Sequence, residues 1–201
     1  MVKLNKDFWI NCIGIILIII FLLRAYSLLI DGVWFQIFWL CNHATLIIGL
    51  AILYRSSFIL IGELSLSLAG SLTWTMDYLS RVFFNFHLFG STEYIFDEIG
   101  TFFFYISSIN HLIFIPLVLT ALFLINKPAK NSWKFSLSHG IFLIAIAFLF
   151  EKDYNLNCIV QSCIDWIPTF NFYPLIFISA YFFVIILPLD NMLNGLIKRN
   201  Q

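Results

Sequence analysis

Two residues of this chain, Cys41 and His111, could act together as a nucleophile and its base. An imidazole that takes the proton of a thiol makes it a nucleophile, and such a pair transfers acyl groups through a thioester. Each residue lies in its own apolar stretch, about eight and ten residues from the end expected to face out of the cell. At 1.5 Å per helical residue their depths nearly match, so that two helices could bring them together.

Polar neighbours of this pair could support the reaction. Asn42 and Asn110 are candidates for donating a hydrogen bond to the oxyanion of an acyl-transfer intermediate. Thr45 shares a helical face with Cys41 and is the alternative nucleophile, whereas His43 lies about 200° around the helix and should point away from the thiol. The non-catalytic interpretation is a buried histidine in the fourth apolar stretch that bonds to a backbone carbonyl.

A polar stripe runs along one face of the helix expected at residues 58–79. Its members lie three or four residues apart and within about 80° of one another on the helix: Glu63, Ser67, Gly70, Trp74 and Asp77. Ionisable side chains at membrane depth cost about 2.5–3.5 kcal/mol each and usually face the interior of a bundle. We expect the stripe either to line a cavity or to pack against a neighbouring helix.

The intramembrane histidines and carboxylates suggest a second kind of chemistry, transport or proton handling. We expect His139 and Glu63 near the cytoplasmic end, His43 and His111 near the middle, and Asp77 near the outer end, at levels about 10 Å apart. Groups at such separate levels could relay protons, but they could not bind a single metal ion together. We therefore predict no metal site, and no cofactor, since the chain has no Gly-rich phosphate loop.

The composition restricts the elements that can position these residues. Of the 201 residues, 61% are hydrophobic and 11% are charged, and the net charge is zero. A soluble globule would lack the polar residues to cover its surface, and a disordered chain needs low hydrophobicity. Nucleic-acid binding is excluded because Lys and Arg only equal Asp and Glu in number. The composition thus predicts a polytopic membrane protein.

The fold predicted is all-α, a six-helix transmembrane bundle that forms a single domain over residues 1–201. A membrane-spanning helix needs about 20 apolar residues, and we expect such helices at 8–30, 34–54, 58–79, 101–125, 135–150 and 171–189. The first is too long for a signal peptide and lacks a small-residue cleavage site, so it should be retained. The aromatic segment 81–100 should form a short interfacial piece with a helix start at Ser91 or Thr92.

The distribution of Lys and Arg predicts that both termini are cytoplasmic. Three basic residues fall on the opposite side, namely Arg24, Arg81 and Lys152, against eight on the cytoplasmic side: Lys3, Lys6, Arg55, Lys127, Lys130, Lys134, Lys198 and Arg199. On the non-cytoplasmic side, Cys158 and Cys163 could form a disulfide in an oxidising compartment.

Four stretches, in order along most of the chain, carry a recognisable pattern. They are 38–41; 62–64 with 68–72; 109–111 with Pro116; and 153–157 with 164–168 and 173–174. In them the chain resembles the YwaF-type bacterial membrane proteins, whose clan includes the transmembrane protein 164 family and the androgen-induced-protein lipid hydrolases. The resemblance implies six helices and action on lipid acyl groups, with a Thr or Cys of the second helix and a His of the fourth, here Cys41 and His111. Where the family usually has a His before Leu-Cys, this chain has Trp39.

Together these observations predict an intramembrane lipid acyl hydrolase or acyltransferase. We expect membrane lipids as partners, a lipid or acyl chain as ligand, and a multi-pass location in a bacterial cytoplasmic membrane. Two alternatives stay open: a non-catalytic membrane scaffold whose polar groups serve packing, and a small transporter that uses intramembrane His, Glu and Asp. The sequence identifies no protein partner.

Overall fold

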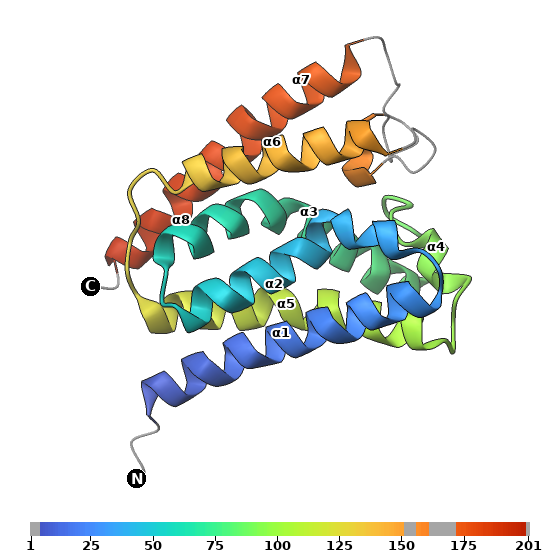
Figure 1. The fold of residues 1–201 in the computed structure, drawn as a ribbon, viewed down its shortest axis with the longest axis horizontal. Helices are drawn as coiled ribbons and strands as arrows, with labels where there is room; N and C mark the ends of the chain where they lie inside the picture. The colour runs from blue at the N-terminus through green and yellow to red at the C-terminus, as the bar shows by residue number, and fades with distance from the viewer. Residues whose placement is uncertain (1–4, 151–155, 161–171, 200–201) are drawn as a thin grey trace.

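The computed structural model of the protein describes residues 5–150, 156–160 and 172–199, and these contain helices and no strand. Figure 1 shows their arrangement. The helices are α1 (Lys6–Ile30), α2 (Leu40–Leu53), α3 (Ser57–Phe84), α4 (Glu93–Phe96), α5 (Phe102–Ile125), α6 (Trp133–Leu149), α7 (Tyr173–Ala180) and α8 (Leu187–Arg199). A π-helical segment (Tyr181–Ile186) joins α7 to α8, and 3₁₀ segments lie at Trp34–Phe38 and Leu156–Cys158.

The all-α prediction is confirmed, but the number of helices is not. With α7 and α8 counted as one continuous helix, the described residues form seven helices rather than six, because α4 stands between α3 and α5. The start of α4 after Thr92 agrees with the expected interfacial helix. Thr92 is the N-cap residue of α4 but forms no side-chain cap bond, because its hydroxyl donates to Asp77 at 2.6 Å.

The predicted helix at 34–54 is broken at Trp39, which has an extended backbone (φ −67°, ψ 135°). Asn157 clamps this break, because its Oδ1 accepts from the Leu40 N–H at 2.6 Å and its Nδ2 donates to the Phe38 carbonyl at 3.0 Å. The partner lies more than 100 residues away in the chain, so that the local sequence could not reveal the break.

Two helices extend beyond their predicted ends. Helix α3 continues to Phe84 and ends at Asn85, which adopts the left-handed conformation (φ 59°) and bonds to the Arg81 guanidinium at 2.7 Å. The last helix continues to Arg199 because α8 buries Leu193 and Ile197 against the bundle. Its π-helical segment precedes Pro188, whose ring cannot fit against the carbonyl four residues earlier in a regular α-helix.

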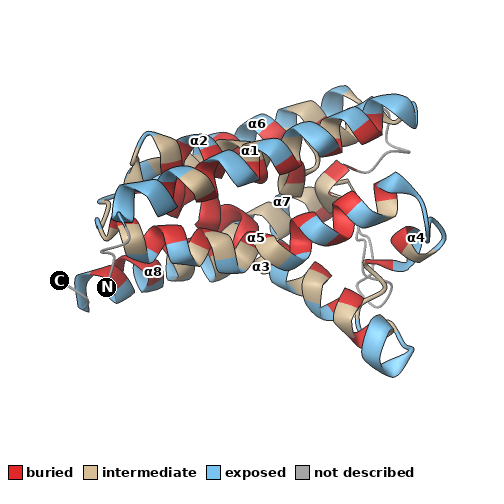
Figure 2. Ribbon diagram, turned by 90° about the horizontal axis from the view of Figure 1, so that it is seen from below, coloured by how far each residue is buried: buried red, intermediate tan, exposed pale blue. Residues whose placement is uncertain are grey.

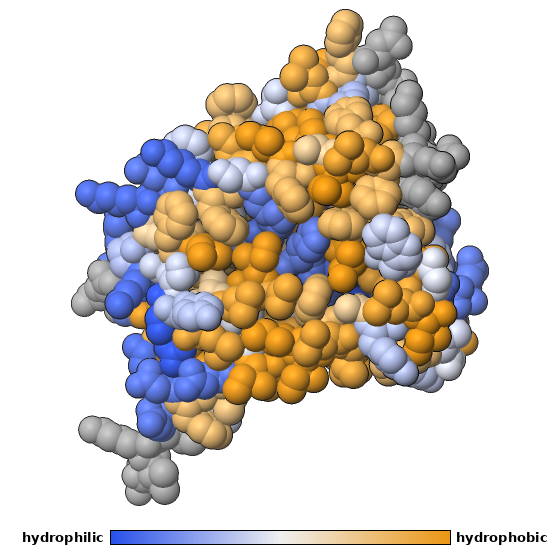
Figure 3. Space-filling model, viewed as in Figure 1, coloured by the Kyte–Doolittle hydropathy of each residue, from blue (hydrophilic) through white to orange (hydrophobic). Residues whose placement is uncertain are grey.

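Four helices are long and apolar enough to cross a membrane: α1, α3, α5 and the continuous helix Tyr173–Arg199. Helices α2 and α6 are apolar but shorter, with 14 and 17 residues. Hydrophobic side chains cover most of the face drawn in Figure 3, and hydrophilic ones gather where α1 begins and α8 ends. Large apolar side chains stand exposed on several helices, as a lipid-facing surface would show: Leu29, Phe83, Leu175 and Phe183. These features are compatible with a membrane protein.

The core lies where α1, α2, α3 and α5 pack together, and buried residues gather there in Figure 2. Leu17, Ile48, Leu64 and Val118, one from each helix, are fully buried. Small residues let α1 and α2 approach closely: a Cβ added at Gly14 would lie 3.0 Å from the Gly49 carbonyl oxygen. This core holds the helices that carry the candidate site.

Helix α6 packs onto α3 at Gly62, which gives a first prediction. A Cβ at this position would lie 2.5 Å from the Ser132 carbonyl oxygen and 2.9 Å from the Phe135 Cβ, whereas nothing lies within 4 Å at Gly70 on the same helix. We expect Gly62→Ala to destabilise the protein by about 1–3 kcal/mol. The matched Gly70→Ala should be neutral or stabilise by up to about 1 kcal/mol. Unfolding in detergent, followed by circular dichroism, measures both; equal stabilities would contradict the packing described.

Candidate active site

Cys41 lies at the N-terminus of α2, as the second residue of the helix. The thiol is free and half-buried. The first N–H groups of a helix have no partner four residues back within the helix. The Asn42 N–H donates to the Trp39 carbonyl at 3.0 Å, so the Cys41 N–H is the backbone donor that remains beside the thiol.

His111 is held in one orientation on α5. Its Nδ1 lies 2.9 Å from the Ser107 carbonyl oxygen, and its ring stacks on Trp74 with 3.9 Å between centroids. A carbonyl oxygen only accepts, so in a neutral ring Nδ1 carries the hydrogen and Nε2 carries the lone pair. In this tautomer Nε2 makes no hydrogen bond to the residues that the structure describes, so that it can act as a base.

Hydrogen bonds connect the parts of α2 and α5 that carry the two residues. The Thr45 hydroxyl, one turn after Cys41, lies 2.8 Å from the Cys41 carbonyl oxygen and 2.9 Å from Asn110 Oδ1. Asn110 directly precedes His111 in the sequence. Arg24 of α1 is close enough to both Cys41 and His111 to interact with each electrostatically. The structure therefore places the thiol and the imidazole in one region of the bundle.

Two further residues of this region, Arg24 and Tyr94, were not predicted from the sequence as parts of the site. Arg24 is only 6% exposed, and its guanidinium carbon lies 3.9 Å above the centre of the Phe103 ring. The Tyr94 hydroxyl accepts from the Trp74 indole at 3.2 Å and lies near Cys41. Although the Tyr94 side chain reaches the surface, burial of its hydroxyl raises the pKa of the phenol, which stays neutral. An arginine six residues inside an apolar helix was the available signal for this site.

The two candidate oxyanion donors differ in what they can do. Asn42 has one of its two side-chain N–H groups engaged, because its Nδ2 donates to the Gln36 carbonyl at 2.6 Å. Gln36 belongs to the 3₁₀ segment, whose carbonyl groups remain open to such a bond because the helix breaks at Trp39. The Oδ1 of Asn110 accepts from the Thr45 hydroxyl, so that the amide nitrogen of Asn110 can still donate to another acceptor.

The polar stripe of α3 does not line one continuous cavity. Glu63 and Asp77 are both fully buried, but Glu63 bonds to His139 of α6 at 2.8 Å while Asp77 bonds to the loop that precedes α4. The Ser67 hydroxyl donates to the Glu63 carbonyl of its own helix. Gly70 lies exposed, and Trp74 packs on His111. Helix α3 is 28 residues long, so its ends meet different neighbours.

His43 points away from the thiol, as expected, and joins the Glu63 side of the bundle. Its ring centre lies 5.7 Å from that of His139. The expectation that these two histidines occupy separate levels is therefore wrong, because α6 packs on α3 and its His139 ring meets the His43 ring of α2 there. No three His, Cys, Asp or Glu residues of the described chain are grouped so as to hold a metal ion.

Cys158 directly follows Asn157, which accepts from the Leu40 N–H beside Cys41. Cys158 is disulfide-bonded, whereas Cys12 and Cys41 are free. The predicted partner of Cys158 is Cys163, which falls outside the described residues, as does most of the last stretch of the family pattern.

Comparison with protein-family models, with curated proteins and with solved structures gives no match for this chain.

Proposed function

We propose that this protein is a six-span integral membrane enzyme, an acyl hydrolase or acyltransferase that acts on lipids through Cys41 and His111. In this proposal α2 and α6 are short spans, both termini are cytoplasmic as the basic residues predict, and the chain is a YwaF-type protein of a bacterial cytoplasmic membrane. The single observation that carries the catalytic proposal is the hydrogen bond from His111 Nδ1 to Ser107, which leaves the lone pair on Nε2, on the helix that Asn110 joins to the helix of Cys41.

The reaction follows from these groups. His111 Nε2 takes the thiol proton, and the Cys41 sulfur attacks the carbonyl carbon of a lipid ester. The carbonyl oxygen becomes an oxyanion, for which the Cys41 backbone N–H and the side-chain amide of Asn110 are the candidate donors, since the Asn42 N–H donates to the Trp39 carbonyl at 3.0 Å. The C–O bond then breaks, and the leaving alkoxide takes the proton from His111. A thioester remains on Cys41.

The second half of the reaction releases the acyl group. His111 Nε2 takes a proton from water or from the hydroxyl of a second lipid, and the resulting oxygen nucleophile attacks the thioester carbon. The C–S bond breaks, and the proton returns from His111 to the sulfur. Water as the acceptor makes the protein a hydrolase, and a lipid alcohol makes it an acyltransferase.

Covalent labelling tests this proposal. We expect a lipid-like activated acyl-ester probe to label the detergent-purified protein at one site, and Cys41→Ala and His111→Ala to abolish that labelling. Labelling that persists in Cys41→Ala would move the nucleophile to another residue, with Thr45 the next candidate. A folded wild-type protein without any labelling would contradict an acyl enzyme and would favour the non-catalytic scaffold.

A second candidate function, proton-coupled transport, is favoured by a chain of buried polar groups. Glu63, His139 and His43 follow one another across α3, α6 and α2, and both Glu63 Oε1 and His43 Nδ1 are buried without a hydrogen-bond partner among the described residues. Intramembrane chains of this kind can relay protons. In proteoliposomes, proton flux that Glu63→Gln abolishes and Cys41→Ala leaves unchanged would support this function instead.

A further inference from the structure

A buried positive charge without a direct ion-pair partner, Arg24, lies within electrostatic range of Cys41 and of His111, and the Asp31 carboxylate acts on it only at longer range. Arg24 is 6% exposed, its Nη1 has no hydrogen-bond partner, and no ion pair includes it among the residues that the structure describes. A guanidinium buried without a partner is strongly destabilising. Its contact with the Phe103 ring offsets only part of that effect.

Other hydrogen-bond donors gather around the same region. The Ser107 hydroxyl is 1% exposed and has no partner within the described chain, and Ser107 shares its face of α5 with Phe103 and His111 at spacings of four residues. The Tyr94 hydroxyl accepts from Trp74, so that its own hydrogen is left to donate. Donors that converge without an acceptor fit an electron-rich ligand group.

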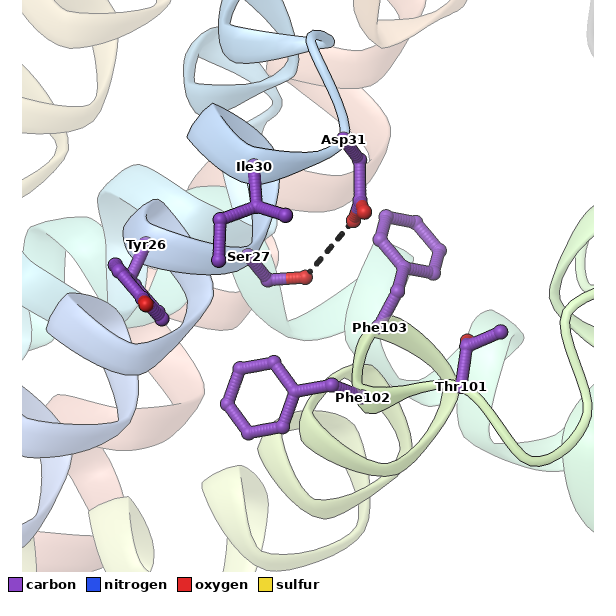
Figure 4. A pocket seen from close by; sticks show the side chains of 7 residues that line it. All are labelled: Tyr26, Ser27, Ile30, Asp31, Thr101, Phe102 and Phe103. Carbon is purple, nitrogen blue, oxygen red and sulfur yellow. Dashed lines mark hydrogen bonds between the residues drawn. The ribbon is translucent and has the colours of Figure 1, made fainter.

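A pocket lies next to Arg24, and the two share Phe103. It has a volume of about 190 Å³ and lies between the end of α1 and the start of α5. Figure 4 shows the lining residues: Tyr26, Ser27, Ile30, Asp31, Thr101, Phe102 and Phe103. The Phe103 ring belongs both to this lining and to the contact with Arg24. Tyr26, Ile30 and Phe102 are at least half exposed, so apolar side chains surround the opening.

We propose that Arg24, assisted by Ser107 and Tyr94, binds an oxyanion of the acyl lipid, so that the site takes acidic acyl lipids in preference to neutral ones. A guanidinium matches the oxygens of a phosphate or a carboxylate in a two-point hydrogen bond. Arg24 lies about 9 Å from the end of α1, near the level where lipid esters meet their headgroups. The proposal rests on the proposed function for the reacting ester, but the binding itself needs no reaction.

Binding measurements with Cys41→Ala, which cannot turn the lipid over, test this proposal. In an uncharged detergent we expect this protein to bind phosphatidylglycerol or oleate at least about 10-fold more tightly than diacylglycerol with the same chains. Arg24→Gln should remove that preference, and Ser107→Ala should weaken it. Asp31→Asn, which removes a negative charge from the pocket lining, is the matched control and should retain or increase the preference. If phosphatidylglycerol binds more tightly than oleate, the oxyanion that Arg24 binds is a phosphate; if oleate binds more tightly, it is a carboxylate.

The outcomes separate this proposal from the proposed function. Arg24→Gln should unfold no earlier than the parent protein without lipid, because it removes a buried charge that has no direct ion-pair partner, and Ser107→Ala gives an independent test. Equal affinity for acidic and neutral lipids, or a preference that survives Arg24→Gln, would overturn the role of Arg24 even if Cys41 is acylated by the probe. A preference that depends on Arg24 in a protein that the probe does not label would support this proposal and overturn the acyl enzyme.

Discussion

Replacing His111 by glutamine is expected to slow the acylation of Cys41 by about 10²- to 10⁴-fold. Glutamine can still donate to the Ser107 carbonyl that now accepts from Nδ1, but it cannot take the thiol proton. The time course of probe incorporation into the wild type and into His111→Gln measures the effect, and circular dichroism confirms that the variant is folded.

His43→Gln is the matched control for this result. His43 lies on the helix of Cys41, but its ring is directed to His139 rather than to the thiol. We expect the acylation rate of His43→Gln to stay within about 3-fold of the wild type, because His43 exchanges no proton with the thiol. Equal losses in both variants would show that the rate reflects the general stability of the bundle and not a base at position 111.

Asp77→Ala is expected to destabilise the protein by about 3–5 kcal/mol. The carboxylate is fully buried and accepts from the backbone N–H groups of Phe89, Gly90 and Thr92 and from the side chains of His87, Ser91 and Thr92. Its removal leaves these donors without an acceptor. Because the loop it holds leads into α4, we also expect Tyr94 to lose its position near Cys41.

The midpoint of thermal or denaturant unfolding in detergent measures this loss. Asp97→Ala removes an exposed carboxylate just after α4 and should change the stability by less than about 0.5 kcal/mol. A stability of Asp77→Ala close to that of Asp97→Ala would contradict the anchoring role of Asp77. An active Asp77→Ala enzyme would show that the loop is not needed to form the site.

The sequence predicted the parts of the site that depend on helical spacing. The 100° rotation per residue separated His43 from Cys41. The matched depth of Cys41 and His111 stays a prediction, because the helix of Cys41 begins at Leu40 and not at residue 34. Long-range contacts could not be predicted in this way. The break at Trp39 depends on Asn157, and this break turned Asn42 toward Gln36.

The polar stripe shows the same limit within one helix. Periodicity correctly placed Glu63 and Asp77 on buried positions of α3, but it carries no information about what covers each end of a 28-residue helix. Helix α6 meets Glu63 and the loop before α4 meets Asp77. Arg24 was counted only as a charge that orients the chain, because its contacts with Phe103 and the α4 region exist only in the folded protein.

Detection of an acyl thioester on Cys41 tests the central claim most directly. The purified protein would be incubated with an acyl lipid in mixed micelles, quenched with acid and analysed by intact mass and peptide mapping. We predict a mass increase of one acyl chain on the peptide that contains Cys41, removed by hydroxylamine at neutral pH and absent from Cys41→Ala. An acyl group on a different residue, or consumption of the lipid by Cys41→Ala at the wild-type rate, would contradict the account.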